Sequence, residues 1–79
     1  MSQFPSPKEV ERIKKMYPKG TRIQIERMND PYHPIERGTK GTVDYVDDIG
    51  TLHCTFDNGR CQGVVTDTDI FHVIDRLDV

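Results

Sequence analysis

The stretch Gly38-Thr39-Lys40-Gly41-Thr42-Val43 decides which fold the sequence predicts. It sets two glycines just ahead of an alternating run, in which Val43 and Tyr45 are expected on one face and Asp44 on the other. Glycine tolerates a positive φ and the close approach of a neighbouring chain. The pair therefore predicts the kinked start of a strand that folds over tightly, as strands do in small closed barrels.

Five segments of the chain have the short alternating pattern of β-strands. They cover residues 21–28, 42–46, 51–56, 61–65 and 70–74. The side chains expected to face inward are Ile23, Ile25, Leu52, Cys54, Phe56, Phe71 and Val73. Asn58-Gly59 is a strong hairpin signal between the third and fourth segments, and Gly63 would fit a bend or bulge. Residues 29–37, which include two prolines, form a long loop between the first two strands.

One amphipathic helix is predicted ahead of the strands. Ser6 can cap it, Pro7 suits its first position, and Glu9 stands where a capping box needs an acidic residue. The apolar stripe that must pack against the rest of the protein comprises Val10, Ile13 and Tyr17, with Met16 beside it.

Together these elements predict a mainly β fold, an SH3-like five-stranded small barrel preceded by one N-terminal amphipathic α-helix. Residues 1–5 are expected to be a flexible N-terminus, and residues 6–17 the helix. Residues 18–75 form the expected barrel, and residues 76–79 a C-terminal tail.

Length and composition limit the stability that such a domain can reach. With 79 residues, of which 34% are hydrophobic and 30% charged, the chain makes one domain with a small core. We therefore expect it either to be marginally stable or to gain stability from a partner or from self-association. The sequence has neither a signal peptide nor an apolar run that could span a membrane, which predicts a soluble cytoplasmic protein.

The charges are distributed unevenly along the chain. Residues 1–40 carry nine Lys and Arg against five Asp and Glu, whereas residues 41–79 carry two against eight. Such a distribution can guide contact with a partner of either sign, or head-to-tail self-contact. A Lys-rich helix and Asp-rich turns explain it more simply.

The chain has two cysteines, Cys54 and Cys61. We interpret both as reduced small hydrophobic residues, because no second pair completes a zinc site. If the hairpin closes through Asn58-Gly59, Phe56 faces Cys61 and Cys54 lies diagonally from it. Diagonal neighbours are too far apart for good disulfide geometry.

Six short motifs stand in a fixed order along the chain. They are Gly20-Thr21-Arg22-Ile23, Met28-Asn29-Asp30-Pro31-Tyr32-His33-Pro34-Ile35, Gly38-Thr39-Lys40-Gly41-Thr42-Val43, Val46-Asp47-Asp48-Ile49-Gly50, Phe56-Asp57-Asn58-Gly59 and Asp69-Ile70-Phe71. This series resembles a short domain family of unknown function that bacteriophages and bacteria encode, alone or attached to larger phage proteins. Over residues 18–75 the resemblance implies an SH3-like barrel in a phage setting, with no catalytic residues to carry over.

Two details qualify this resemblance. Phe56 stands where tryptophan is common in the family; it can fill the same core position but lacks the indole donor. The stretch that begins at Gly38 also resembles the glycine-rich start of KOW-type barrels, which bind RNA or proteins.

The long loop and the turn after the second strand form the candidate binding site. In an SH3-like barrel these segments flank a groove, and aromatic and proline residues there offer apolar area at low entropic cost. The candidate binding residues are Asp30, Tyr32, His33, Tyr45, Asp47 and Asp48. The alternative is that Tyr32 and Ile35 pin the loop onto the barrel.

A basic region around the helix is the alternative binding surface. It comprises Arg12, Lys14, Lys15, Lys19 and Arg22. Such a region would contact the phosphates of a nucleic acid. The acidic pI of about 5.8 and the lack of a clear aromatic stacking platform favour a solvated helix face instead.

Metal binding and catalysis have weaker support in the sequence. The aspartates at 47, 48, 57, 67 and 69 fall in turns, where Asp commonly bonds nearby backbone N–H groups. The three histidines lack metal-ligand spacing, and the Cys54 thiol is expected in the core, where thiols are inert. We therefore expect no enzyme activity, no metal and no cofactor.

The sequence thus predicts a non-enzymatic small binding module, encoded by a phage, that acts as a protein-interaction adaptor or inhibitor, including in counter-defence. Two alternatives stay open. One is a nucleic-acid-binding accessory barrel that uses the basic region, and the other is a module that sequesters a small nucleotide-like ligand between subunits.

Overall fold

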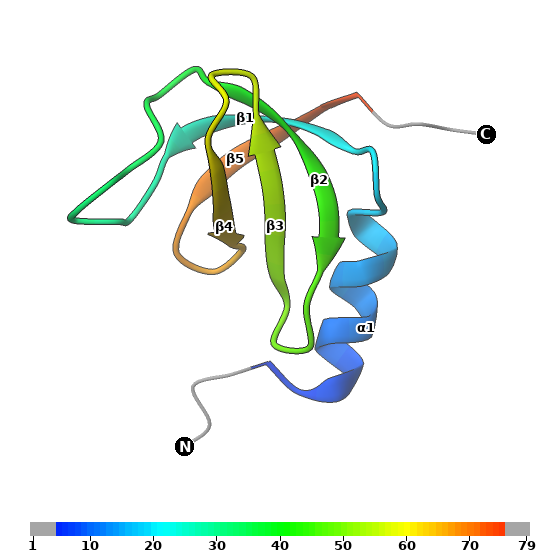
Figure 1. Ribbon diagram of the computed structural model, residues 1–79. Coiled ribbons are helices and arrows are strands. Elements are labelled where there is room, and N and C mark those ends of the chain that lie inside the picture. The colour runs from blue at the N-terminus through cyan, green and yellow to red at the C-terminus, as the bar shows by residue number, and fades with distance from the viewer. Residues whose placement is uncertain (1–4, 76–79) are drawn as a thin grey trace.

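The computed structural model describes residues 5–75. It contains helix α1 (Pro7–Met16) and strands β1 (Arg22–Arg27), β2 (Lys40–Val46), β3 (Thr51–Phe56), β4 (Cys61–Val65) and β5 (Ile70–Asp75) (Figure 1). The expected helix and five strands are confirmed, although β2 begins at Lys40, ahead of the expected Thr42. Residues 1–4 of the expected flexible N-terminus and the expected tail, 76–79, lie outside the described residues.

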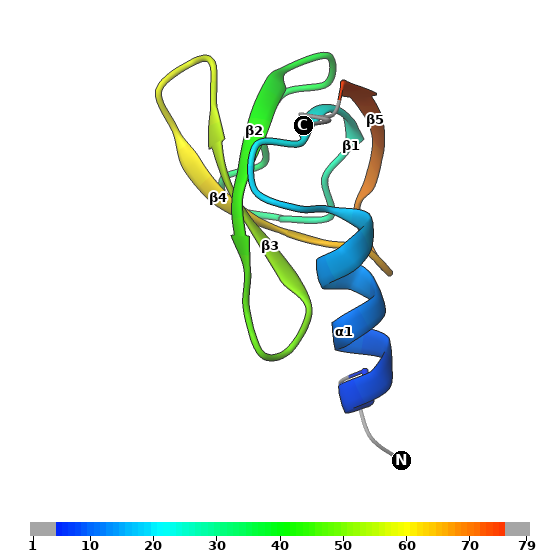
Figure 2. The same ribbon diagram turned by 90° about the vertical axis from the view of Figure 1, so that its right-hand side faces the viewer.

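The five strands form one antiparallel sheet in the order β4-β3-β2-β1-β5. Short turns join β2, β3 and β4 into a meander, while β1 lies between β2 and β5. Figures 1 and 2 show that the sheet is strongly curved and that α1 lies to one side of it. Within residues 5–75, no pairing joins β4 to β5, so these two strands are the edges of the sheet.

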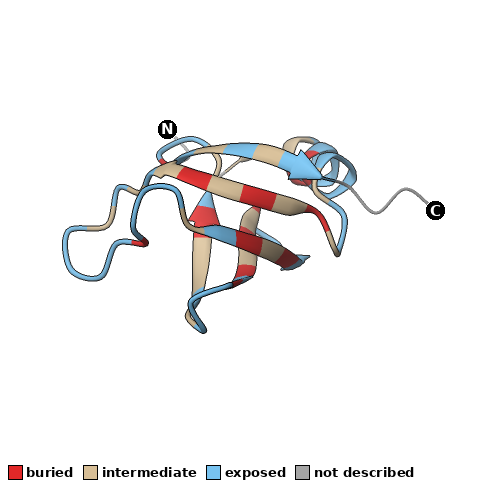
Figure 3. Cartoon of the chain, turned by 90° about the horizontal axis from the view of Figure 1, so that it is seen from above, coloured by how far each residue is buried: buried red, intermediate tan, exposed pale blue. Residues whose placement is uncertain are grey.

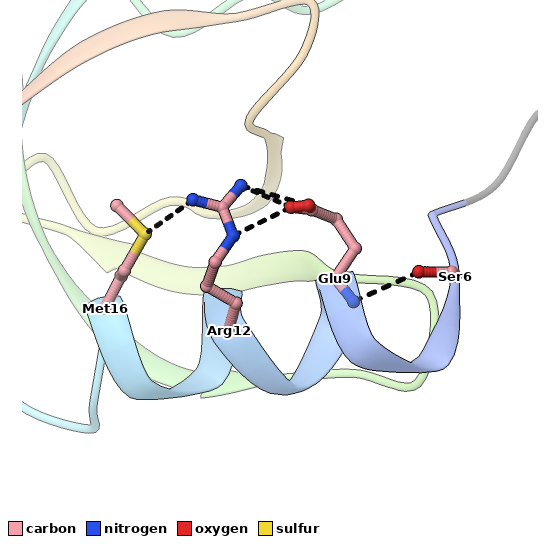
Figure 4. A network of polar contacts seen from close by, with 4 residues as sticks. All are labelled: Ser6, Glu9, Arg12 and Met16. Carbon is pink, nitrogen blue, oxygen red and sulfur yellow. Dashed lines mark hydrogen bonds and ion pairs between the residues drawn. The ribbon is translucent and has the colours of Figure 1, made fainter.

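Helix α1 begins where the capping residues predict. The Oγ atom of Ser6 accepts a hydrogen bond from the N–H of Glu9 at 3.2 Å, and Pro7 occupies the first turn. The Glu9 carboxylate pairs with Arg12 (Figure 4) and does not return to the Ser6 N–H. The predicted capping box therefore forms only its Ser6 half in the described structure.

The apolar side of α1 packs over the turn between β2 and β3. Val10 and Ile13 are both buried, whereas Met16 is exposed. A Cβ atom on Gly50, in that turn, would lie 3.1 Å from the Cδ1 atom of Ile13. Gly50 also has a φ of 83°, so its lack of a side chain serves both the turn and the helix contact.

The core lies inside the curved sheet. Its buried members are Ile13, Ile23, Ile25, Ile35, Val43, Leu52, Cys54, Phe56 and Val64. Figure 3 shows that buried positions alternate with less buried ones along the strands. The inward faces predicted for the first and third strands are confirmed, and Phe71 and Val73 of β5 pack partly buried against the core.

The two glycines of the stretch 38–43, Gly38 and Gly41, have different structural roles. Gly38 has a φ of 88°, and its N–H donates to the carbonyl of Ile25 at 2.7 Å, which closes the base of the long loop. Gly41 lies in β2 directly beside Phe56: an added Cβ atom would be 2.5 Å from the Cδ1 atom of that ring. A kinked start and a close approach were both predicted here, and both are confirmed.

The predicted facing of β2 is wrong beyond Val43. Val43 pairs with Cys54 and Tyr45 pairs with His53, so Asp44 is an extra residue in β2 and forms a bulge. Val43 is therefore buried, whereas Tyr45 is 57% exposed on the other face of the sheet. A bulge shifts the alternation by one residue, which a simple period of two does not include.

The predicted pairing of β3 with β4 is also wrong, by one residue. Cys61 lies opposite Thr55, not opposite Phe56, and the register continues without a break across Gly63. Both cysteines are free, and the predicted core position of Cys54 is confirmed, whereas Cys61 is exposed. No bulge forms at Gly63.

No helix in the described part of the chain has the length and apolar character that a membrane crossing requires.

Candidate functional site

Asp47 fixes the turn from β2 to β3. Its Oδ1 atom accepts hydrogen bonds from the N–H groups of Ile49 and Thr51 at 3.0 and 2.9 Å, and its Oδ2 atom lies 2.7 Å from the Nε2 atom of His53. Burial raises the pKa of Asp47, but the hydrogen bonds from His53, Thr51 and Ile49 outweigh it and hold the pKa below its ordinary value. The turn interpretation of this aspartate is confirmed.

The ring of His53 is covered on one face by Tyr45. The two rings are parallel within 5°, and their centroids are 4.4 Å apart. This contact exists because the bulge at Asp44 brings Tyr45 opposite His53 in the β2–β3 pair. Asp47 holds the imidazole at its edge while Tyr45 holds its face, so the position of His53 is fixed from two directions.

These rings line a groove of about 290 Å³ across β2, β3 and β4, termed here the tyrosine groove. Its lining residues are Asp44, Tyr45, His53, Cys54, Cys61, Gln62 and Gly63. Gly63 lies opposite His53 in the β3–β4 pair. A Cβ atom added to Gly63 would lie 2.9 Å from the Cγ2 atom of Thr51, so β3 and β4 approach closely at this position.

The long loop between β1 and β2 is fixed by hydrogen bonds at its start. The Oδ1 atom of Asp30 accepts from the N–H groups of Tyr32 and His33 at 2.8 and 3.2 Å. These two bonds, with a further bond from Gln62, hold the pKa of Asp30 below its ordinary value against a smaller opposing effect of burial. Farther along, Ile35 is only 2% exposed and anchors the loop in the core.

Strand β4 and the turn before it brace the same loop from the other side. The guanidinium of Arg60 donates to the carbonyls of His33 and Pro34 at 2.8 and 3.2 Å, and to the Oε1 atom of Gln62 at 3.1 Å. The amide of Gln62 in turn donates to the Oδ2 atom of Asp30 at 2.7 Å. This continuous network ties the loop to β4.

A second groove, of about 200 Å³, separates residues 28–31 from β4 and from the turn before β5; it is termed the loop groove. Its floor includes Asp69, which is 8% exposed and accepts from the N–H groups of Asn29 and Val65 at 2.7 and 2.8 Å. Gln62 and Gly63 line both grooves. The two grooves therefore adjoin at β4.

A family model described as a domain of unknown function (DUF4314) matches residues 6–74. The chain belongs to this family. The expected membership in a short domain family of unknown function is thereby confirmed, and the match includes α1 as well as the strands. Searches of the curated proteins and of the solved structures each found no match.

In this DUF4314 domain the expected loop residues lie together, and Asp30 lines the loop groove. Tyr32 is 83% exposed, so it does not pin the loop; of the two residues considered for that role, only Ile35 fills it. His33 is exposed, and its backbone is bound at both its N–H and its carbonyl.

The expected residues of the β2–β3 side form a separate group. Tyr45 lines the tyrosine groove, and Asp47 reaches the same groove through His53. Asp48 is fully exposed and points to the helix, where its carboxylate lies 3.6 Å from the Nζ atom of Lys14. Gln62 and Gly63 connect the loop group with the Tyr45 group, and Asp48 joins neither.

The basic residues of the alternative surface do not form one uncompensated patch. Arg12 binds Glu9 along the helix (Figure 4), Lys14 lies near Asp48, and Arg22 makes two hydrogen bonds to Asp57 at 2.9 and 2.8 Å. Lys15 and Lys19 are exposed. Three of the five expected basic residues therefore already have an acidic partner within the domain.

Four residues of this site were not predicted from the sequence. They are His53, Arg60, Gln62 and Gly63. His53 was expected to be a solvated side chain on an outward face, and its outward position is confirmed. No local pattern indicates its contacts, because its partners depend on a bulge in the neighbouring strand.

Proposed function

We propose that this domain is a non-enzymatic protein-binding module, an adaptor or inhibitor, that presents the braced loop of residues 30–35 and the two adjoining grooves to a partner. The observation that carries the proposal is that Tyr32 is 83% exposed on a loop whose backbone is fixed by Asp30 and Arg60. An aromatic side chain on a fixed loop offers large contact area at little entropic cost, which is typical of interface hot spots.

The strand order supports an SH3-like barrel as the architecture of this module. A meander of β2, β3 and β4, with β1 between β2 and β5, is the order of strands in such barrels, and the sheet curves in the sense that closure needs. The resemblance of the motifs to phage- and bacterium-encoded domains supports a phage origin, with the host cytoplasm as the place of action.

The polar groups of the site support binding more than catalysis. Asp47 uses both of its oxygens on the turn and on His53, so this partly buried acid–imidazole contact already serves the structure. Burial raises the pKa of the Cys54 thiol to about 12, so this cysteine is not ionised near neutral pH.

The two alternative functions have less support. A nucleic-acid binder would need free cationic side chains, and most of the expected ones are paired. A small-ligand binder would need an enclosed pocket, whereas both grooves are open to solvent.

A capture experiment tests the proposal. The tagged domain is used to capture proteins from host lysate, and Tyr32→Ala with His33→Ala is compared with the matched pair Lys14→Glu with Lys15→Glu. We expect the loop variant to lose the captured protein and the helix variant to retain it, with both melting temperatures unchanged. Loss in the helix variant alone would overturn the proposal.

Two further measurements separate the alternatives. Binding to mixed DNA and RNA that falls steeply with salt would favour the nucleic-acid binder. A small molecule retained in native mass spectrometry of protein purified from its host would favour the sequestering module.

A further inference from the structure

We propose that the tyrosine groove binds an arginine side chain from a cationic segment of the partner protein. This inference rests on the proposed protein-binding function and adds the chemistry of the partner. It depends on three features of the groove, which are a supported aromatic ring, a positioned carboxylate and a lining that, among the described residues, contains no Lys or Arg.

The aromatic ring is that of Tyr45. One face of this ring lies flat on His53, at a centroid distance of 4.4 Å, and His53 is itself held by Asp47. Tyr45 nevertheless remains 57% exposed. A supported, exposed ring is a suitable surface for a planar guanidinium, which stacks on aromatic faces and is attracted by their quadrupole.

The carboxylate is that of Asp44, the extra residue of the bulge. Its Oδ2 atom accepts a hydrogen bond from the Oγ1 atom of Thr55 at 2.6 Å, which orients the group. Within the described residues, Asp44 has no Lys or Arg as an ion-pair partner. The bulge thus places a carboxylate that has no Lys or Arg partner among the described residues beside Tyr45 in the lining of the same groove.

The charges of the surrounding surface agree with a cationic occupant. Among the described residues, no Lys or Arg lines the tyrosine groove or the loop groove, whereas Asp44, Asp30 and Asp69 do. A polyanion such as a nucleic acid would be repelled from this surface, and a cationic peptide attracted to it. Arginine is favoured over lysine because only a guanidinium can stack on Tyr45 and bond a carboxylate in its own plane.

The shape favours a segment of polypeptide over a free amino acid. Gln62 and Gly63 line both grooves, so the tyrosine groove and the loop groove meet at this point of the edge strand β4. An extended peptide can therefore place an arginine on Tyr45 while its neighbouring residues occupy the loop groove beside Asp30.

The test measures binding of fluorescein-labelled peptides to the full chain by fluorescence anisotropy. The probes are a peptide of three Gly-Ser-Arg repeats and the same peptide with lysine, or with neutral citrulline, in place of arginine. We expect the arginine peptide to bind about tenfold more tightly than the citrulline peptide, with lysine between them.

Variants then locate the binding. We expect Asp44→Asn and Tyr45→Ala each to weaken binding of the arginine peptide about five- to tenfold, and Tyr45→Phe, which keeps the ring, to retain it. Glu11→Gln on α1 removes the same charge as Asp44→Asn from a distant surface and should leave binding unchanged. Equal binding of the arginine and citrulline peptides would overturn the inference, as would equal weakening by Glu11→Gln and Asp44→Asn.

Two other occupants would also overturn it. One is a second copy of the chain, revealed by concentration-dependent dimers that Asp44→Asn abolishes and the arginine peptide does not displace. The other is single-stranded RNA that depends on Tyr45 while the arginine peptide does not bind. If capture through Tyr32 succeeds and the arginine peptide fails, the proposed function stands and this inference alone is lost.

Discussion

At the scale of single residues, Asp47 has the largest number of polar contacts in the β2–β3 connection. One carboxylate satisfies two backbone N–H groups and one imidazole. Tyr45 rests on that imidazole, so the turn and the aromatic part of the candidate site depend on the same side chain.

We expect Asp47→Ala to lower the free energy of unfolding by about 1–3 kcal/mol, because it leaves the partly buried N–H of Thr51 and the N–H of Ile49 without their acceptor. Urea denaturation followed by circular dichroism measures this loss. The neighbouring Asp48 is fully exposed, so Asp48→Ala should change stability by less than about 0.5 kcal/mol. Equal effects of the two substitutions would contradict the assigned role of Asp47.

Gly41 lies directly beside the Phe56 ring, and this close contact explains why residue 41 has no side chain. We expect Gly41→Ala to destabilise the domain by about 1–3 kcal/mol, because the new methyl group collides with the Phe56 ring. Phe56→Ala should cost about 3–5 kcal/mol through the cavity it leaves.

A double-mutant cycle tests whether the two effects have this common cause. Phe56→Val removes the ring atoms that the Gly41 methyl would meet, so Gly41→Ala should cost clearly less on that background than in the wild type. Additive costs would indicate that Gly41 is required for its backbone conformation and not for the ring.

At the scale of secondary-structure elements, the β3–β4 pairing decides the chemistry of the two cysteines. The observed register places Cys61 opposite Thr55 on the exposed face and leaves Cys54 buried. The two thiols therefore lie on opposite faces of the sheet, and burial raises the pKa of Cys54 to about 12.

We expect the native protein to react with one equivalent of a thiol reagent, at Cys61, and with a second equivalent only after denaturation. Peptide mapping identifies the labelled residue, and Cys61→Ser should remove the fast reaction. An oxidised mass, two hydrogens lighter, would contradict both this register and the free thiols.

The loop between β1 and β2 is held as an element by contacts from β4. We expect Arg60→Ala to increase amide hydrogen exchange at Ile35 and the residues before it, because the carbonyls of His33 and Pro34 lose their donors. Arg37→Ala is the matched control, since within residues 5–75 its guanidinium forms an ion pair with Glu26, at 3.5 Å, and none with the loop backbone. Exchange that rises equally in both variants would show that Arg60 does not brace the loop.

At the scale of the whole molecule, three ionised carboxylates connect separate parts of the fold. Asp30 holds the long loop, Asp47 the β2–β3 turn, and Asp57 is bound by Arg22 of β1. The hydrogen bonds that each carboxylate accepts, foremost that from Arg22 to Asp57, hold its pKa below the ordinary value of 3.8.

The lowered pKa values of these three carboxyl groups determine how the stability of the domain changes with pH. A carboxyl whose pKa is lower in the folded state stabilises the protein above the unfolded pKa and loses this contribution as the pH falls through the folded pKa. We therefore expect the melting temperature to stay level above about pH 5 and to fall progressively below about pH 4.

Thermal melts across this range measure the effect. Asp47→Asn should lower the melting temperature near neutral pH and reduce its further fall in acid, because part of the titrating contribution is gone. A melting temperature that rises on acidification would contradict the assigned pKa shifts.

The sequence by itself determined the elements and most of their inward faces. Alternation identified Ile23 and Ile25 in β1 and the inward residues of β3, and Ser6 and Pro7 marked the start of α1. These features are local, because a strand's alternation and a helix cap are recorded in residues a few positions apart.

Tertiary structure alone decided the bulge at Asp44, the register of Cys61 and the reach of Arg60 to the loop. Each depends on how two distant segments pack: a bulge or a one-residue slip changes which side chains share a face without changing the local pattern. The candidate site consists mainly of such contacts. The sequence could therefore identify Tyr45 and Asp30 as candidates, but their partners His53 and Gln62 were fixed only when the strands paired and the loop packed on β4.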